Sequence, residues 1–279
     1  MLIGGKYRVG ERIGRGAFGS VYSCVDTDTG EKLAVKQQKD SNEYEYRVLL
    51  CLADTGVVPK VYLYTENFET KPGSMTGSFL CMQRMCMDLK QLADKHNLKK
   101  NSKLLLSIVI SLFRALRKIH DGGWIHRDLK PGNIMFSEDL SGTVYVDFGL
   151  AKKYLMRGGR HIPLIKNKNT VVGTAKYLSK WCHEHVQQSR RDDCASLMYT
   201  VSKCANGPLP WDKVGRELGV KDKLAFIYKK KCETPLSVLF QGLPPSLTAV
   251  MEKIQKLEFD QRPDYTGYQR LLLRDWKKF

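Results

Sequence analysis

The sequence has little that would place the protein outside the cell or in a membrane. Its first residues, 1–7, lack the basic start and apolar stretch of a secretory signal. The longest apolar run, residues 104–113, is interrupted by two serines and is too short to cross a bilayer. The eight cysteines form no C-x-x-C pair, a pattern that favours reduced thiols over a disulfide framework. We therefore expect a protein of the cytosol or nucleus without a membrane span.

Acidic residues are scarce relative to basic ones. The chain contains 46 Lys and Arg against 29 Asp and Glu, which gives a net charge of +17. These cations either solvate the surface or bind anions such as nucleotides, acidic or phosphorylated proteins, or nucleic acid, and charge alone does not choose between these interpretations. A length of 279 residues with a hydrophobic share of 42% fits one large domain or two lobes.

The first eighty-odd residues have the pattern of a sheet that carries one helix. Short apolar runs and Gly-rich turns alternate over residues 7–36, with a hairpin turn at 28–30. Further strands are predicted at 57–64 and 78–84. A helix is predicted over 41–53, and its expected apolar face consists of Tyr46, Leu49, Leu50 and Ala53.

The remainder of the chain is mainly helical in pattern. Ser102 is the expected N-cap of a helix that ends at 121–123, and a short strand is expected at 143–146. The helix has apolar residues at helical spacing, namely Leu105, Ile108, Val109, Leu112, Leu116 and Ile119. The run Lys229–Lys231 is interpreted as a solvated helix end. We expect an α+β fold with a small antiparallel β-sheet lobe (1–83), a larger mainly helical lobe (84–279) and a crevice between them.

Two motifs supply residues suited to phosphoryl transfer. Residues 125–133 read Ile-His-Arg-Asp-Leu-Lys-Pro-Gly-Asn, and an Asp-Phe-Gly triplet begins at Asp147. Asp128 is the candidate base or orienting group for an incoming hydroxyl, and Lys130 can neutralise charge on the moving phosphoryl group. Asn133 and Asp147 are candidate magnesium ligands, because Mg²⁺ prefers oxygen donors.

A third motif, at residues 14–21, is a Gly-rich loop. Glycine lets the backbone approach phosphate oxygens, where a Cβ would obstruct. A dinucleotide-binding loop would open a helix, whereas the segment after this loop reads as a strand, which excludes that alternative. Its candidate nucleotide-binding residues are Gly14, Arg15, Gly16, Ala17, Phe18, Gly19 and Val21.

Lys36 lies in a strand-like run two strand-lengths after the loop, where it is expected to hold the α- and β-phosphates. It needs a carboxylate partner on the following helix, and Glu43 and Glu45 are both candidates. We favour Glu45, because the apolar positions after it fit the helix face better.

Together these motifs resemble those of eukaryotic protein kinases over nearly the whole chain, and Asp-Leu-Lys-Pro at 128–131 resembles the serine/threonine-specific branch. The chain is further similar to the casein kinase 1 family, which also lacks an Ala-Pro-Glu after its activation segment. This finer similarity lies in residues 150–154, 161–163, 167–169, 173–177, 189–193, 259–260 and 263–265.

The resemblance implies an active serine/threonine kinase that uses ATP and Mg²⁺, and we expect it to be a monomer. It implies Met82 as gatekeeper, a hinge at Gln83, Arg84 and Met85, and Asp193 as a brace of the catalytic loop. The adenine would be sandwiched by Val21, Ala34 and Met135.

The family favours acidic or previously phosphorylated protein substrates. By resemblance, Lys176 would bind the substrate anion with help from Lys221 or Lys223, and Arg127, Lys152 and Lys168 would form a second basic pocket. The chain departs from the family pattern at Cys86, where Gly is usual, and at Trp181, where Asn is usual.

Two functions other than an active kinase, and one local metal site, are alternatives that the sequence disfavours. A nucleotide-binding scaffold would be favoured by loss of Lys36, Asp128 or Asp147, and all three are present. A nucleic-acid reader would show interleaved aromatic and basic motifs, and none is found. A zinc site at residues 182–185 is disfavoured, because no second ligand cluster is evident.

Overall fold

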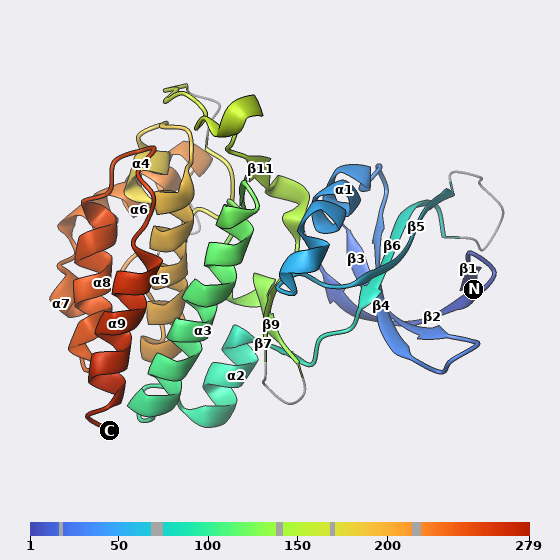
Figure 1. Ribbon diagram of the computed structural model, residues 1–279, viewed down its shortest axis with the longest axis horizontal. Helices are drawn as coiled ribbons and strands as arrows, with labels where there is room; N and C mark the ends of the chain where they lie inside the picture. Colours follow the sequence, from blue (N-terminus) through green and yellow to red (C-terminus); the bar gives the residue numbers. More distant parts are fainter. Residues whose placement is uncertain (17–18, 68–74, 138–141, 168–170, 214–218) are drawn as a thin grey trace. The chain divides into compact units, whose positions relative to one another are not determined.

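The computed structural model describes residues 1–16, 19–67, 75–137, 142–167, 171–213 and 219–279 (Figure 1). It divides into two compact units. Unit 1 comprises Met1–Cys86 and Val144–Gly149, and unit 2 comprises Met87–Thr143 and Leu150–Phe279. The expected α+β class is confirmed, with an antiparallel sheet in unit 1 and a larger, mainly helical unit 2. Among the described residues, no helix combines the length and apolar character that a bilayer crossing requires.

Unit 1 is built on an antiparallel sheet in the spatial order β1-β2-β3-β4-β6-β5. Its strands are β1 (Leu2–Ile3), β2 (Tyr7–Arg15), β3 (Ser20–Asp26), β4 (Lys32–Gln38), β5 (Val61–Asn67) and β6 (Gly77–Gln83). The expected hairpin turn joins β3 to β4. There Asp26 Oδ1 accepts the N–H groups of Asp28 and Thr29 at 2.9 and 3.3 Å, and Gly30 has φ 75°.

One face of this sheet is covered by apolar side chains. Alternate residues along a strand point to the same face, so Leu33 and Val35 of β4 lie on the same side. The cluster that forms there consists of Ile3, Tyr7, Cys24, Leu33, Val35, Phe79 and Cys81. These side chains fix the register of β4, and with it the position of Lys36.

The helix α1 (Glu43–Leu52) buries a different face from the one expected. Leu50 is 51% exposed and Ala53 is also exposed, so their assignment to the buried face was wrong. The buried positions follow the i, i+3, i+4, i+7 spacing of a helix and are Glu45, Val48, Leu49 and Leu52. The buried face includes the carboxylate of Glu45, so the spacing of apolar residues alone did not predict it.

The strand expected over 57–64 starts later, since β5 begins at Val61. Val57 and Val58 are buried but lie outside the strand, and Pro59 lacks the N–H that a strand ladder uses. The carbonyl of Val57 instead accepts the N–H of Tyr145 at 2.9 Å. This bond helps explain why Val144–Gly149 groups with unit 1.

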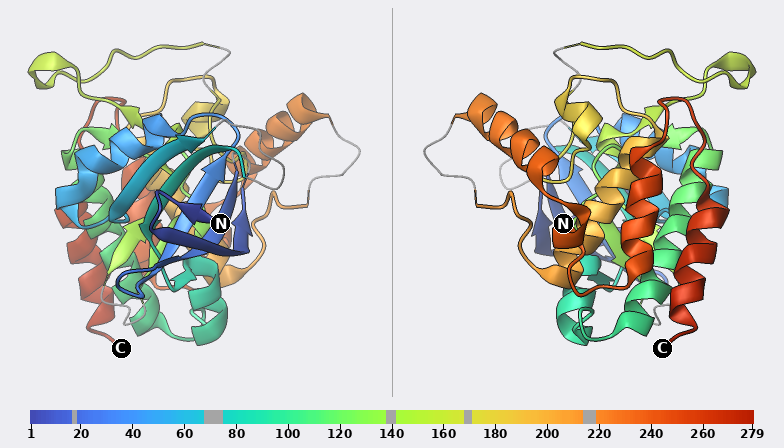
Figure 2. Two further views of the ribbon diagram at one scale, coloured as in Figure 1. Left: turned by 90° about the vertical axis from the view of Figure 1, so that its right-hand side faces the viewer. Right: turned by 90° about the vertical axis from the view of Figure 1, so that its left-hand side faces the viewer.

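Unit 2 is organised around helices that pack on one another (Figures 1 and 2). They are α2 (Leu89–His96), α3 (Ser102–Asp121), α4 (Lys180–His183), α5 (Arg190–Asn206), α6 (Val220–Glu233), α7 (Leu236–Leu239), α8 (Pro245–Gln255) and α9 (Tyr265–Trp276). The short strand β7 (Met87–Asp88) pairs with β9 (Ile134–Phe136), and β8 (Trp124–Ile125) pairs with β11 (Lys152–Lys153). The strand β10 (Thr143–Tyr145) begins at the end of the first unit 2 segment.

The helices α3 and α5 form the centre of unit 2. The apolar stripe expected on α3 is buried throughout, and α9 packs along this helix (Figure 2). The N-cap of α3 is Asn101, whose side chain accepts the N–H of Leu104 at 3.0 Å, so the choice of Ser102 was wrong by one residue. The helix α5 is almost wholly buried, including Asp193, and so provides a rigid base for the neighbouring loops.

Candidate active site

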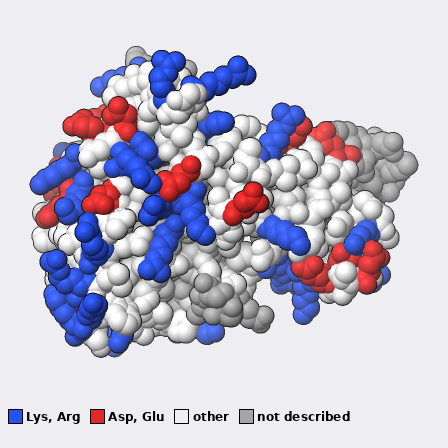
Figure 3. All heavy atoms as spheres, in the orientation of Figure 1, with Lys and Arg blue, Asp and Glu red and all other residues white. Residues whose placement is uncertain are grey.

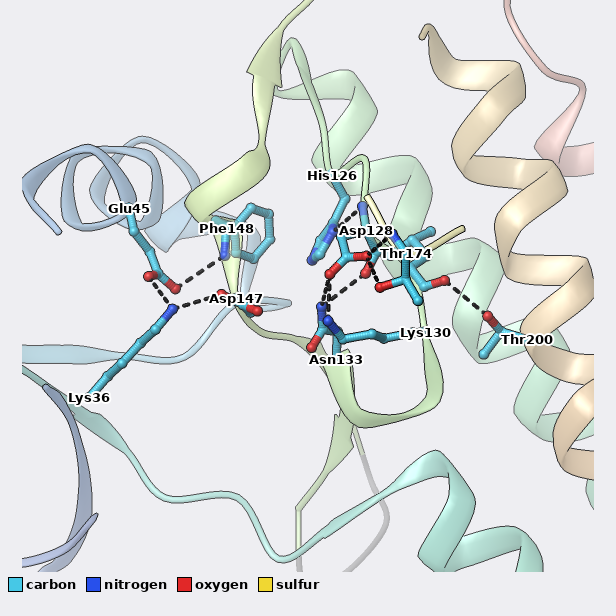
Figure 4. Close-up of polar contacts among 11 residues, drawn as sticks. Lys36, Glu45, His126, Asp128, Lys130, Asn133, Asp147, Phe148, Thr174 and Thr200 are labelled. Atoms are coloured by element: carbon cyan, nitrogen blue, oxygen red, sulfur yellow. Dashed lines mark hydrogen bonds and ion pairs between the residues drawn. The ribbon is translucent and has the colours of Figure 1, made fainter. Parts of the chain in front are cut away.

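Unit 1 contains a buried ion network centred on Lys36 of β4 (Figure 4). Lys36 Nζ lies 2.6 Å from Glu45 Oε2 and 2.7 Å from Asp147 Oδ1. Glu45 Oε1 accepts the N–H of Phe148 at 3.1 Å. The other carboxylate considered, that of Glu43, is exposed and pairs with Arg47. The structure therefore contains the Lys36–Glu45 pair that the sequence favoured.

The two carboxylates of this network stabilise the charge of Lys36. Burial alone would lower the pKa of Lys36, but the adjacent Glu45 and Asp147 carboxylates outweigh it and raise that pKa. Lys36 is therefore a permanent cation, held in position from two sides. Such a fixed ammonium group is suited to hold phosphate oxygens.

The Gly-rich loop joins β2 to β3. Gly14 pairs with Val21 and Arg15 with Ser20, while the N–H of Gly16 donates to the carbonyl of Gly19 at 2.8 Å. A Cβ on Gly19 would lie 2.1 Å from Gln37 O, so glycine is required there by the packing on β4. Ala17 and Phe18, also expected to bind nucleotide, lie outside the described residues.

The expected adenine-binding residues of unit 1 lie on paired strands. Ala34 of β4 is opposite Met82 of β6, and both side chains are buried. The N–H of Gln83 donates to Lys60 O at 2.8 Å, so this group is not a donor for a nucleotide. Met85, which follows β6, is half-buried. Met135, the remaining expected residue, is half-buried on β9 of unit 2.

In unit 2, the carboxylate of Asp128 is surrounded by donors (Figure 4). Thr174 donates to its Oδ1 from the backbone N–H at 2.8 Å and from the hydroxyl at 2.7 Å. Lys130 Nζ lies 2.6 Å from Oδ2, and Asn133 Nδ2 lies 3.2 Å from the same oxygen. These contacts fix the orientation of a side chain that is only 5% exposed. The three sequence-predicted residues Asp128, Lys130 and Asn133 are thus brought together.

The loop that carries Asp128 is anchored to α5 by Asp193. The two carboxylate oxygens of Asp193 accept the N–H groups of His126 and Arg127 at 2.7 and 2.9 Å. Burial would raise the pKa of Asp193, but its contacts with His120 and His126 lower it below the usual value. Arg127 adopts a left-handed conformation, with φ 69°, which such anchoring can hold. The expected bracing role of Asp193 matches this geometry.

The donor atoms of Asn133 and Asp147 suit magnesium, and each lies in its own unit. Asn133 donates through Nδ2 to Asp128, so the side-chain oxygen of Asn133 is the atom suited to act as a metal ligand. Asp147 has a left-handed backbone, with φ 67°, and its side chain is 25% exposed. Each residue thus offers a type of oxygen that Mg²⁺ accepts as a ligand.

Residues 182–184 of the disfavoured zinc motif engage other groups. Cys182 Sγ is 3.3 Å from Gln188 Nε2, and Glu184 Oε1 accepts the hydroxyl of Tyr228 at 2.7 Å. In the described ranges, no group of three or more His, Cys, Asp or Glu residues is arranged to hold a metal.

The expected anion-binding residues occupy several environments. Burial and the charge of Arg127 lower the pKa of Lys152, so these two cations lie close enough to repel. Lys176 Nζ lies 3.0 Å from Asp212 Oδ1, and Lys223 is half-buried on α6. Lys168 and the side chain of Lys221 lie outside the described residues.

Sequence reasoning missed two residues of this region. Thr174 was noted only as part of a family motif, although it supplies two donors to Asp128. Lys231 was assigned to a solvated helix end, which is wrong, because its side chain is 2% exposed. The sequence could have indicated this burial, because Lys231 lies one helical turn after the apolar Ile227, which is also buried.

The family model described as the protein kinase domain matches residues 7–276. This match includes the loop at 14–21, the ion network of Lys36, the donors around Asp128 and the whole of the anchoring helix α5. Protein kinases transfer the terminal phosphoryl group of ATP to protein substrates, typically with Mg²⁺. The chain belongs to the protein kinase family.

Proposed function

We propose that this kinase phosphorylates serine and threonine in acidic or previously phosphorylated proteins, as casein kinase 1 enzymes do. The convergence of Lys130 and Thr174 on Asp128 carries this proposal. A carboxylate held by these donors stays oriented towards a substrate hydroxyl, and the adjacent ammonium offsets charge on the transferred group. The Asp-Leu-Lys-Pro motif in which Lys130 stands supports an aliphatic hydroxyl as the acceptor.

The other residues have complementary roles in this proposal. Lys36 holds the nucleotide phosphates, with Glu45 as the partner that keeps its side chain in place. Asn133 and Asp147 hold magnesium, which supplies positive charge to the phosphate oxygens when bound. Asp128 receives or orients the hydroxyl of the substrate. Val21, Ala34, Met82 and Met85 provide apolar contacts and a backbone edge for adenine.

The distribution of charge supports an acidic substrate. The charge of Arg127 helps lower the pKa of Lys152, so an anion bound beside these two cations would offset their repulsion. Lys and Arg also gather over α3 and α9 (Figure 3). The exposed cations of these helices are Lys103, Arg114, Lys118, Arg270 and Arg274, and the exposed Lys277 follows the end of α9. Lys176 already pairs with Asp212, so a substrate anion has to displace that carboxylate.

The environment of Arg127 also supports activity without prior phosphorylation. Its guanidinium donates to the carbonyls of Leu150 and Ala151 at 2.6 and 3.4 Å, so protein groups already engage it. Tyr154 is buried and donates its hydroxyl to His120 O, which excludes it as an accessible phosphorylation site. Thr170, the only serine or threonine between Gly149 and Gly173, lies outside the described residues.

The proposal is tested by initial rates on peptides that differ at single positions. One set carries Ser, Thr or Tyr as acceptor, and a second carries phosphoserine, Glu or Ala upstream of a fixed serine. We expect transfer to Ser and Thr, little to Tyr, and the order phosphoserine, then Glu, then Ala. ATP binding without transfer to any peptide would favour a nucleotide-binding scaffold, and a preference for Tyr or for Ala upstream would contradict the assignment.

A further inference from the structure

Lys231 on α6 is a buried cation that the proposed reaction does not use. Its side chain is 2% exposed, and Nζ donates to the carbonyl oxygens of Ala175 and Leu178 at 3.0 and 2.6 Å. The ammonium group also lies 5.1 and 5.3 Å from the ring centroids of Tyr199 and Trp211. Two carbonyl dipoles and two ring faces therefore surround this one nitrogen.

The third hydrogen of the ammonium group has a partner in His183. Nε2 of His183 lies 3.2 Å from Lys231 Nζ and accepts the bond in the tautomer that carries its proton on Nδ1. Burial and the nearby charge of Lys231 lower the pKa of His183 to about 3, so this imidazole is neutral at physiological pH. Every N–H of Lys231 is thus satisfied.

Burying a lysine in this way carries a cost that an apolar residue would avoid. Burial lowers the pKa of Lys231 well below its usual value, because dipoles and ring faces offset the charge only in part. A leucine or methionine would fill the same space without this penalty. What an apolar side chain cannot do is bind the carbonyls of Ala175 and Leu178, so the benefit of Lys231 lies in fixing that segment.

The segment that Lys231 holds leads directly to Asp128. Ala175 follows Thr174, which donates twice to Asp128, and the carbonyl of Thr174 accepts the N–H of Tyr177 at 2.9 Å. We infer that Lys231 is a positioning residue that clamps residues 174–178 and thereby holds Thr174 against the carboxylate of Asp128. Lys231 does not touch substrate or nucleotide in this role, and it acts only through the segment.

The test compares Lys231→Met, which has similar length and no donor, with Lys230→Met as a matched control. Lys230 is the preceding residue on α6 and pairs with Glu233 at the surface. We expect kcat for a serine peptide to fall about 10- to 100-fold in Lys231→Met, as loosened positioning of a reacting group does. The Kd for ATP and the KM for peptide should each stay within about twofold of wild type. The control should match wild type.

A double-mutant cycle separates positioning from a general effect on folding. If Lys231 acts through Thr174, the double variant Lys231→Met/Thr174→Ala should lose no more kcat than the worse of the two single variants. Losses in kcat that simply multiply would overturn the inference, as would a folded Lys231→Met enzyme with wild-type kcat. Should Lys231→Met fail to fold, Lys231→Gln removes the charge and keeps an amide with two N–H donors, so the same comparison is made with a smaller expected loss of kcat.

Amide hydrogen exchange gives a readout that needs no catalysis. Without the clamp, the amides of residues 174–178 should exchange faster, while those of α3 should be unchanged. Unchanged exchange at 174–178 would overturn the inference even if the enzyme proved inactive on every peptide. Conversely, faster exchange in an inactive protein would uphold the clamp and count only against the proposed function.

Discussion

Replacing Glu45 by Gln is the sharpest perturbation of the Lys36 network. The amide oxygen of Gln can still accept the N–H of Phe148, which Glu45 accepts at 3.1 Å. What is lost is the negative charge 2.6 Å from Lys36 Nζ, at a site where Glu45 is 2% exposed. Lys36 then has Asp147 as its remaining carboxylate in this network. The substitution therefore changes charge while nearly preserving shape.

The size of the effect follows from burial. Removing one partner of a buried ion pair costs about 3–5 kcal/mol in the free energy of unfolding. Because Asp147 still compensates Lys36 and Phe148 keeps an acceptor, we expect a loss smaller than this range, about 2–3 kcal/mol in the free energy of unfolding. If Lys36 stabilises the transition state less by a similar amount, about 2–3 kcal/mol, kcat/KM for ATP falls about 30- to 150-fold.

Glu43→Gln is the matched control, because it removes the same charge two residues earlier on α1. Glu43 forms an i,i+4 pair with Arg47 and its side chain is 49% exposed, so its loss should cost at most about 0.5 kcal/mol. Urea unfolding and steady-state kinetics with varied ATP measure both quantities. Equal effects of the two substitutions, or a Glu45→Gln enzyme with wild-type kcat/KM for ATP, would refute the assigned role of Glu45.

Two further predictions concern unit 2. Gly173 has φ 110°, and a Cβ there would lie 2.3 Å from Arg127 O, so Gly173→Ala should lower both the melting temperature and kcat. Gly132 has open space where a Cβ would lie, so the control Gly132→Ala should not lower the melting temperature. The folded-state pKa of His183 is lowered to about 3 from 6.5, so its stabilising contribution is complete above pH 6.5 and is lost as pH falls. Between pH 7 and 5, wild type should therefore lose about 2 kcal/mol more unfolding free energy than His183→Gln; identical pH dependence in urea titrations would contradict this.

Residues in strongly patterned segments could be placed from the sequence. The buried stripe of α3 follows helical periodicity over a long helix, so its face was evident before the structure. The Lys36–Glu45 pair could be anticipated because Lys36 matches the lysine of the kinase signature, which pairs with a carboxylate on the following helix. Asp128 and Asn133 are five residues apart in one loop, and local chain geometry brings them together.

Features that depend on tertiary contacts could not be read in this way. The face of α1 was misassigned because its stripe includes the carboxylate of Glu45, whose burial depends on Lys36 from a distant strand. Lys231 was misassigned because its partners, Ala175 and Leu178, are more than fifty residues away and are backbone carbonyls, which leave no trace in side-chain pattern. The grouping of Val144–Gly149 with unit 1 likewise reflects tertiary contacts, among them the backbone bond from Tyr145 to Val57.

The most direct measurement is transfer of radiolabelled phosphate from [γ-³²P]ATP, with Mg²⁺, to a phosphoserine-primed serine peptide by wild type and Asp128→Asn. Asn keeps the size of the side chain, but its amide is neutral and does not act as a base for the proton of the substrate hydroxyl. Wild type should label the peptide, and Asp128→Asn should lower the rate by about a thousandfold or more while its Kd for ATP changes less than about threefold. Equal labelling by both proteins would contradict the role of Asp128 on which the account rests.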